Sequence, residues 1–197
     1  MIRTKMLGVA TVMLLFSASS YTYADDSADH KSNDACPVGL VSGMTLVQEF
    51  GQYAADNTRC IKVRHNVKTL FAINNFENSP GSPYALNQMQ NVYNDYTITD
   101  GMVRGKDFSM IAIVHGPGGK LLLNDPTLNP YIDKVTNLMK EGVTFYFCEN
   151  TVRGFIKAGL LQQGDVAAGL IPGVKFVTAG LSAISDFQAL GYQYDEP

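Results

Sequence analysis

The run Met110-Ile111-Ala112-Ile113-Val114 decides the fold class of this chain, because it is apolar at every position. A strand with no polar face belongs to a sheet that is covered on both sides, as parallel sheets are. Other short runs rich in β-branched residues occur before and after it. Together they predict strands at residues 67–73, 110–114, 143–147, 174–177 and 192–194.

Amphipathic segments separate these strands and predict helices. Each has a face of apolar residues at helical spacing: Ala85, Met89, Val92, Tyr93 and Tyr96; Ile132, Val135, Leu138 and Met139; and Ala183, Ile184, Phe187 and Leu190. Gly142 and Gly191 are typical stop signals after the second and third helix. Strands joined through helices run parallel. We therefore predict an α/β fold, a single doubly wound domain at 66–197 with a mainly parallel sheet of about five strands and helices on both faces.

The composition excludes several classes of protein. Of the 197 residues, 46% are hydrophobic and 17% are charged, which argues against a disordered chain, a collagen or a coiled coil. The 18 acidic residues outnumber the 15 basic ones, and no run is rich in Lys or Arg. No nucleic-acid partner is expected, since binding would need a positively charged surface.

The first 24 residues have the pattern of a secretory signal peptide. Arg3 and Lys5 precede an apolar run at 6–16, and small residues end at Ala24. A permanent anchor is the less favoured alternative, because a membrane span needs roughly 20 apolar residues. Removing 1–24, with two basic and no acidic residues, leaves 173 residues with 13 basic and 18 acidic ones, a formal charge of −5. We expect an exported protein with no stable membrane anchor after cleavage.

Two cysteines lie near the start of the exported chain. Residues 25–35 contain no large apolar side chain and should form a mobile leader, in which the isolated His30 has no second metal ligand nearby. Cys36 and Cys60 follow, 24 positions apart. Since export implies an oxidising compartment, we predict a disulfide between them that closes an N-terminal extension at 36–65.

The extension is expected to be helical. Apolar residues recur there at helical spacing, namely Leu46, Phe50, Tyr53 and Ala54. Gly51 interrupts this pattern and weakens the prediction. The disulfide would pin this helix to the body of the domain.

Polar and small residues follow the predicted strands directly. They are Asn74 and Asn75 after the first strand, His115, Gly116, Pro117, Gly118, Gly119 and Lys120 after the second, and Cys148, Glu149, Asn150 and Thr151 after the third. In doubly wound sheets, ligands bind beyond the carboxyl ends of the strands. These residues should therefore share one rim of the sheet, where a binding site is expected.

The third cysteine, Cys148, is either a buried small hydrophobe or a reactive thiol. Asn150 and Thr151 are good N-cap residues, and an amphipathic stretch follows, so the sulfur should lie at a helix N-terminus. Amide groups and the helix dipole stabilise an anion there, which favours a thiolate below the usual pKa of about 8.5. Arg153 would support the thiolate, and Glu149 would oppose it if its carboxylate turned inward. The context favours a functional Cys148.

The segment at 115–120 has two interpretations. Its glycines can hold an anion on backbone N–H groups with Lys120 adding charge, or they can form a tight strand-to-helix turn in which Pro117 starts the helix. His115 is likewise a structural imidazole or a polar partner of Cys148. A Cys/His hydrolase lacks a supporting nucleophile or oxyanion motif. We expect no metal site, because His115 and Cys148 are too few ligands.

Four ordered blocks resemble the DsrE/DsrF-like family. They are VHGPGGKLLL at 114–123, GVTFYFCENTVRG at 142–154, PGVKFVTAG at 172–180 and LGYQY at 190–194, within a resemblance that covers about 66–197. The resemblance implies a small α/β fold that assembles into homotrimers or homohexamers. It also implies a cysteine, here Cys148, that accepts and passes sulfane sulfur as a persulfide. The sulfur-relay members of the family are cytoplasmic, whereas this chain is expected to be exported.

Two functions follow as hypotheses. The first is a periplasmic sulfur carrier or sulfurtransferase, without a cofactor, in which helix N–H groups hold the Cys148 persulfide and His115, Asn74 or Asn75 donate hydrogen bonds. Its partners would be a sulfur donor or acceptor protein or a small sulfane-sulfur compound. The alternative is a noncatalytic periplasmic module that binds a small anion or a nucleotide-like ligand in the same rim pocket, which Cys148 merely lines.

Overall fold

A computed structural model describes residues 44–58 and 66–197 of the chain. The predicted signal peptide, the leader with His30 and the disulfide between Cys36 and Cys60 lie outside the described residues. They stay predictions from the sequence.

The described part of the N-terminal extension contains two short helices, α1 (Leu46–Phe50) and α2 (Gln52–Asn57). Thr45 caps α1 through a reciprocal pair of hydrogen bonds with Gln48. Gly51 separates the helices with a φ of 86°, a backbone conformation that favours glycine. The single helix predicted from the spacing of apolar residues is therefore wrong, since the chain turns at Gly51 and starts a new helix.

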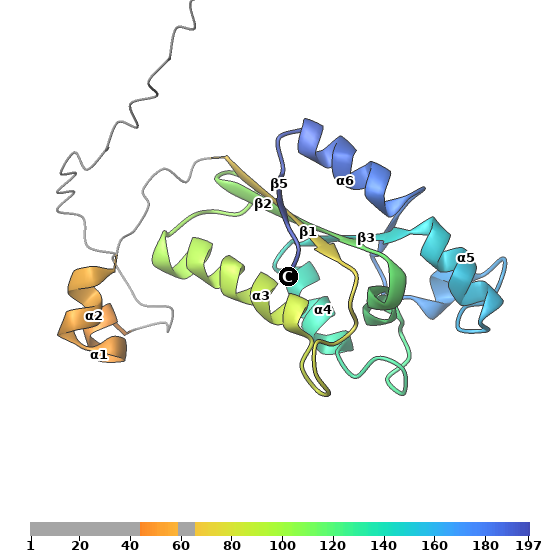
Figure 1. The fold of residues 1–197 in the computed structure, drawn as a ribbon, viewed down its shortest axis with the longest axis horizontal. Coiled ribbons are helices and arrows are strands. Elements are labelled where there is room, and N and C mark those ends of the chain that lie inside the picture. Colours follow the sequence, from red (N-terminus) through yellow and green to blue (C-terminus); the bar gives the residue numbers. More distant parts are fainter. Residues whose placement is uncertain (1–43, 59–65) are drawn as a thin grey trace, which may run out of the picture. The chain divides into compact units, whose positions relative to one another are not determined.

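The sheet has five parallel strands (Figure 1). They are β1 (Val67–Ile73), β2 (Phe108–Val114), β3 (Thr144–Cys148), β4 (Lys175–Val177) and β5 (Gln193–Asp195). Their order is β4-β3-β2-β1-β5, and all four pairings are parallel. The fifth strand thus returns across the sheet to pair with the first. The predicted α/β fold with a five-stranded parallel sheet is confirmed.

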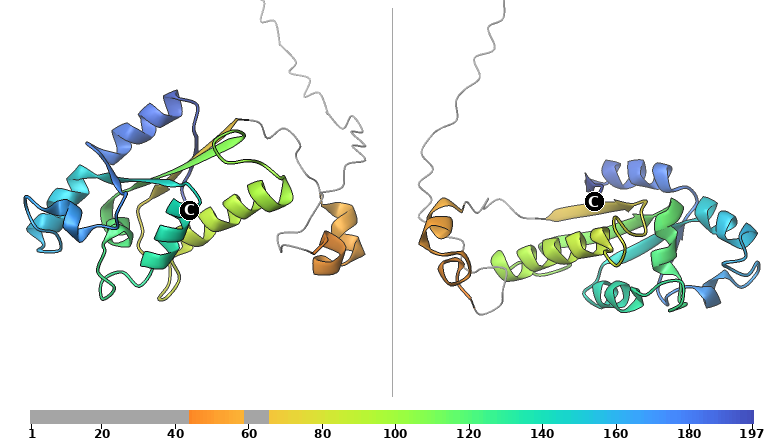
Figure 2. Two further views of the ribbon diagram at one scale, coloured as in Figure 1. Left: turned by 180° about the vertical axis from the view of Figure 1, so that it is seen from behind. Right: turned by 60° about the horizontal axis from the view of Figure 1, so that its bottom comes forward.

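Helices cover both faces of this sheet (Figure 2). α3 (Tyr84–Asn94), α4 (Ile132–Lys140) and α5 (Glu149–Lys157) contribute to the core on one face, and α6 (Gly180–Ala189) covers the other. The strand order explains this division, because crossovers between parallel strands are right-handed. Three crossovers proceed from β1 to β4 and place their helices on one side. The last crossover runs back to β5 and places α6 opposite.

The irregular helices lie in the crossovers. α3 continues into a π-helical turn, η1 (Asp95–Thr99), and short 3₁₀ helices occupy η2 (Gly116–Leu122) and η3 (Val166–Gly169). None of the helices in the described ranges is both long and apolar enough to span a bilayer.

Alternating residues of the central strands enter two separate cores. In β1, Phe71 and Ile73 pack on the side of α3 and α4, while Leu70 and Ala72 pack against α6. All four side chains are buried. Burial of a side chain of the size of Leu or Phe contributes about 1.5–3 kcal/mol. The apolar character of β1 and β2 at successive positions therefore follows from the presence of a core on each face.

Candidate functional site

The carboxyl ends of the five strands form one rim. β1 and β2 pair in register up to Ile73 and Val114, so Asn74 and His115 follow side by side. β2 and β3 pair up to Val114 and Phe147, which brings His115 beside Cys148. The rim that the sequence predicts is therefore present, with Cys148 and His115 on adjacent strands.

Cys148 ends β3 and is itself the N-cap of α5. The predicted N-cap residues, Asn150 and Thr151, are the second and third residues of the helix instead, because α5 starts at Glu149. The side chain is 5% exposed and has no disulfide partner. The sulfur thus lies at the first turn of α5, because Cys148 is itself the N-cap residue.

The N-terminus of α6 supplies a hydrogen bond to this sulfur. The amide of Gly180, the first residue of α6, donates to Cys148 Sγ at 3.2 Å. Burial, the largest influence, raises the pKa of Cys148. The amides of Thr151, Gly180 and Asn150 and the Thr151 hydroxyl lower it, and the net pKa is below its ordinary value. The site favours an anion on the sulfur.

His115 and Cys148 both lie close to Gly180. A Cβ atom built on Gly180 would lie 3.3 Å from the Cβ of His115 and 3.5 Å from that of Cys148. Burial lowers the pKa of His115, and the negative charge of Glu196 opposes this effect. The neutral imidazole is therefore favoured near neutral pH, next to a thiol that tends to ionise.

The glycines of the segment 115–120 allow the tight turn that follows β2. The amide of Gly116 donates to Thr151 Oγ1 and that of Gly118 to the Asn74 carbonyl, each at 2.9 Å. A Cβ atom on Gly118 would lie 2.7 Å from the Ile73 carbonyl oxygen, and one on Gly119 would lie 2.7 Å from the Phe147 ring. This geometry favours the tight-turn interpretation over an anion cradle. The helix that follows is the 3₁₀ helix η2, with Pro117 in its first turn.

The charged candidates lie on the surface. Arg153 forms an ion pair with Glu149 at 3.2 Å and donates to Asn150 Oδ1 at 2.6 Å. Neither Arg153 nor Glu149 contributes to the pKa of Cys148. Lys120 is exposed, with its Nζ 5.9 Å from the centroid of the Phe76 ring.

Asn74 and Asn75 are exposed beside the turn. The side-chain oxygen of Asn74 lies against Gly116, where it would contact any added Cβ atom at 2.5 Å. Asn75 has no hydrogen bond or ion pair to any described residue. The structure therefore brings Asn74 to the turn after β2 and leaves Asn75 at the surface.

Sequence reasoning missed two residues of the rim. Gly180 follows β4 and donates to the sulfur, while Glu196 follows β5 and acts on His115. The Tyr194 hydroxyl donates to Glu196 Oε2 at 2.7 Å. Both residues follow the last two predicted strands, so reading the positions after those strands as well as after the first three would have found them.

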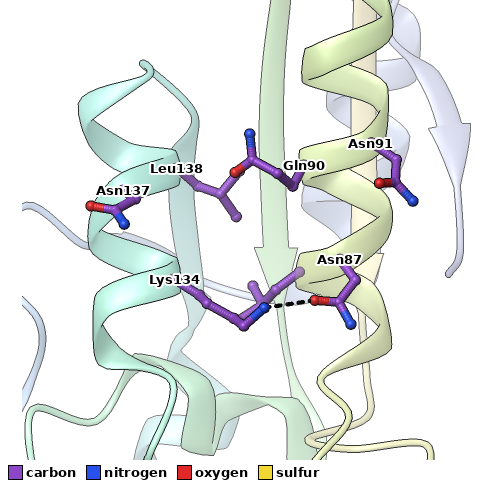
Figure 3. Close-up of a pocket in the computed structure, with 7 residues that line it drawn as sticks. Asn87, Gln90, Asn91, Lys134, Asn137 and Leu138 are labelled. Carbon is purple, nitrogen blue, oxygen red and sulfur yellow. Dashed lines mark hydrogen bonds between the residues drawn. The ribbon is translucent and has the colours of Figure 1, made fainter. Parts of the chain in front are cut away.

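A groove of about 630 Å³ runs between η2 and the start of α5. It brings together Gly116, Lys120, Asn150 and Thr151, four of the predicted binding residues. A second recess, of about 260 Å³, lies between α3 and α4 (Figure 3). Amide side chains line this recess, and Lys134 Nζ donates to Asn87 Oδ1 there at 2.9 Å. It contains none of the residues predicted to form the site.

Metal binding has no support in the described ranges. No group of three His, Cys, Asp or Glu side chains is placed there so that it could hold an ion. The chemistry available at the rim is that of a hydrogen-bonded thiol with an imidazole beside it.

Comparisons with known proteins give the fold and leave the activity open. No family model matches the chain, and no curated protein matches it. Among solved structures, the chain is similar to MTH1491 from Methanobacterium thermoautotrophicum, a protein of unknown function. The two are 26% identical, the match covers 67% of this chain and 100% of that chain, and the TM-score is 0.50. The chain thus shares its α/β fold with a protein whose activity is not established.

Proposed function

We propose that this protein is a periplasmic sulfur carrier or sulfurtransferase of the DsrE/DsrF-like type, which holds sulfane sulfur as a persulfide on Cys148. One observation supports it above the others. The amide of Gly180, the first residue of α6, donates a hydrogen bond to the sulfur of Cys148, which is itself the N-cap residue of α5. Amide groups at helix N-termini stabilise the thiolate that attacks and the persulfide anion that results.

The chemistry balances without a cofactor. The Cys148 thiolate attacks the outer sulfur of thiosulfate, the S–S bond of the donor breaks, and sulfite leaves with that electron pair. The product is Cys148-S-S⁻. An acceptor thiolate then attacks the outer sulfur of this persulfide, and Cys148 leaves as the thiolate. His115, favoured as a neutral imidazole, would accept the proton of the Cys148 thiol when the thiolate forms.

The test is persulfide formation on the purified protein. Incubation with thiosulfate or polysulfide is expected to add one sulfur to the intact mass, and peptide mapping should place it on Cys148. The Cys148→Ser variant should gain none. Failure of every sulfane donor to modify the wild-type protein, or modification confined to Cys36 and Cys60, would overturn the proposal.

The groove beside η2 supports a second candidate, noncatalytic binding of a small anion or a nucleotide-like ligand. Lys120 and the hydroxyl-bearing Thr151 line it together. Ligand binding that survives Cys148→Ser, in a protein that takes up no sulfur, would favour this candidate.

A further inference from the structure

The groove between η2 and α5 starts at the rim that carries Cys148. Gly116 and Pro117, which directly follow His115, line one side of it. Asn150 and Thr151, the second and third residues after Cys148, line the other. The groove therefore begins at the first turn of α5, the helix that Cys148 caps.

Away from the rim, the groove is apolar. Phe155, Ala158 and Leu160 form this part, and apolar atoms make up most of its exposed lining. Its volume of about 630 Å³ lies within the usual range for sites that hold an organic ligand. Thiosulfate has five heavy atoms and no apolar group, so it would neither fill this space nor use its walls.

The groove also carries a positive charge. Among the described residues that line it, Lys120 is the one that carries a charge, and none of them is a carboxylate. Lys120 forms no ion pair with any other residue of 44–58 or 66–197. Since acidic residues outnumber basic ones in the whole chain, a local cation is what would attract an anionic group.

We propose that the sulfur donor of Cys148 is a small organic hydropersulfide, R-S-SH, whose apolar R group occupies this groove and whose anionic group contacts Lys120. This inference rests on the proposed function and names its substrate class. The Cys148 thiolate attacks the outer sulfur of the donor, and the S–S bond of the donor breaks. R-S⁻ leaves and takes the proton of the transferred sulfur, which gives R-SH and Cys148-S-S⁻. No oxidant or reductant is consumed.

Gly154 gives a variant that fills the groove and spares the fold. It lies within α5 and lines the groove, and a Cβ atom there would have nothing within 4 Å. Gly154→Leu should therefore occupy the groove without a clash at its Cβ, and Gly154→Ala is the matched control. Both residues have better helix propensity than glycine.

The experiment measures the rate of persulfide formation on Cys148 by intact mass. The donors are 4-carboxybenzyl hydropersulfide, benzyl hydropersulfide and inorganic polysulfide. We expect Gly154→Leu to react with 4-carboxybenzyl hydropersulfide at least tenfold more slowly than Gly154→Ala, while both react equally with polysulfide. Lys120→Gln should slow the carboxylated donor several-fold and leave benzyl hydropersulfide unchanged.

The outcomes separate the two proposals. If no donor modifies the wild-type protein, the sulfur-carrier function is wrong. A second outcome is that polysulfide modifies Cys148 while Gly154→Leu slows neither 4-carboxybenzyl hydropersulfide nor polysulfide, or slows the two equally. In that case the groove is not the site of the R group and the carrier function stands. An equal effect of Lys120→Gln on both organic donors would overturn the role of Lys120.

Discussion

The Gly180 amide donates a hydrogen bond to the sulfur of Cys148. The amides of Asn150 and Thr151 and the Thr151 hydroxyl also lower the pKa of this thiol, and no charged side chain is among the causes. The Thr151 hydroxyl accepts a hydrogen bond from the Gly116 amide. The anion at this position therefore depends on how two helices and a turn are packed. Substitutions that move those groups should change the thiol without changing any formal charge.

Thr151→Val should raise the pKa of Cys148, because it removes the hydroxyl that lowers this pKa and keeps the shape of the side chain. The pH dependence of alkylation by iodoacetamide measures this. In the wild-type protein, the midpoint is expected below the usual value of about 8.5, and the rate should fall as the pH falls through it. Thr151→Ser, which keeps the hydroxyl, should retain the wild-type midpoint. A Thr151→Val midpoint equal to that of the wild type would show that the hydroxyl does not stabilise the thiolate.

Gly180→Ala tests the contact between His115, Cys148 and α6. The new Cβ atom, 3.3 Å and 3.5 Å from the two Cβ atoms, forces one of these neighbours to move by a few tenths of an ångström. Since the Gly180 amide donates to Sγ, we expect alkylation of Cys148 to slow several-fold. Stability should change by less than about 1 kcal/mol, because alanine has better helix propensity than glycine.

The control for Gly180→Ala is Leu181→Ala. This neighbouring residue of α6 has a side chain that is 74% exposed, so its truncation should leave the thiol unchanged. Unaltered alkylation kinetics in Gly180→Ala, with the fold intact by circular dichroism, would contradict the assignment of Gly180 to the site.

At the scale of elements, the glycines of η2 leave no room for a Cβ atom beside β1 and β3. Gly118→Ala should destabilise the protein by about 1–3 kcal/mol or more, because the Cβ atom would lie 2.7 Å from the backbone oxygen of Ile73, and β1 has little room to yield. Gly154→Ala, at an open position of α5, should instead stabilise it by up to about 1 kcal/mol. Urea unfolding curves of the two variants measure the difference. A Gly118→Ala variant as stable as the wild type would mean that the turn relaxes freely.

Periodicity predicted most elements because burial on two faces dictates it. The bounds of β1 are those predicted, and β2 starts two residues earlier, at Phe108, whose side chain is buried against α3 and its π-helical continuation. What periodicity did not predict depends on local backbone geometry. The break at Gly51, the 3₁₀ form of η2 and the N-cap at Cys148 each follow from hydrogen bonds that the spacing of apolar residues does not encode.

At the scale of the molecule, strand order decides which residues reach the thiol. The sequence predicted that His115 and Cys148 share a rim, because both follow strands that any parallel arrangement would align. The contribution of Gly180 and Glu196 depends on the last crossover, which places α6 on the opposite face and β5 beside β1. Such long-range order is not contained in the periodicity of any one segment. The positions after the last two strands mark these two residues as members of the rim, but not their contacts with Cys148 and His115.

The predicted Cys36–Cys60 disulfide concerns the whole chain, because it would tie the extension to the cooperative unit. A closed loop of this length stabilises a protein by about 3 kcal/mol in the loop-closure model, which corresponds to a fall in Tm on reduction of about 6–12 °C for a chain of this size. Alkylation of the unreduced protein should label Cys148 alone, and reduction should expose all three thiols. Labelling of Cys36 or Cys60 before reduction would show that the disulfide is absent.

The reduction experiment must be done on Cys148→Ser. A reductant would also remove a persulfide sulfur from Cys148, so a change in Tm of the wild-type protein would mix the two effects. In Cys148→Ser, only the pair in the extension can respond. The expected result is then the full fall in Tm on reduction and no label before it. An unchanged Tm after complete reduction would mean that the loop between Cys36 and Cys60 unfolds independently of the domain. A crosslink contributes to the stability of a domain only when its loop unfolds together with that domain.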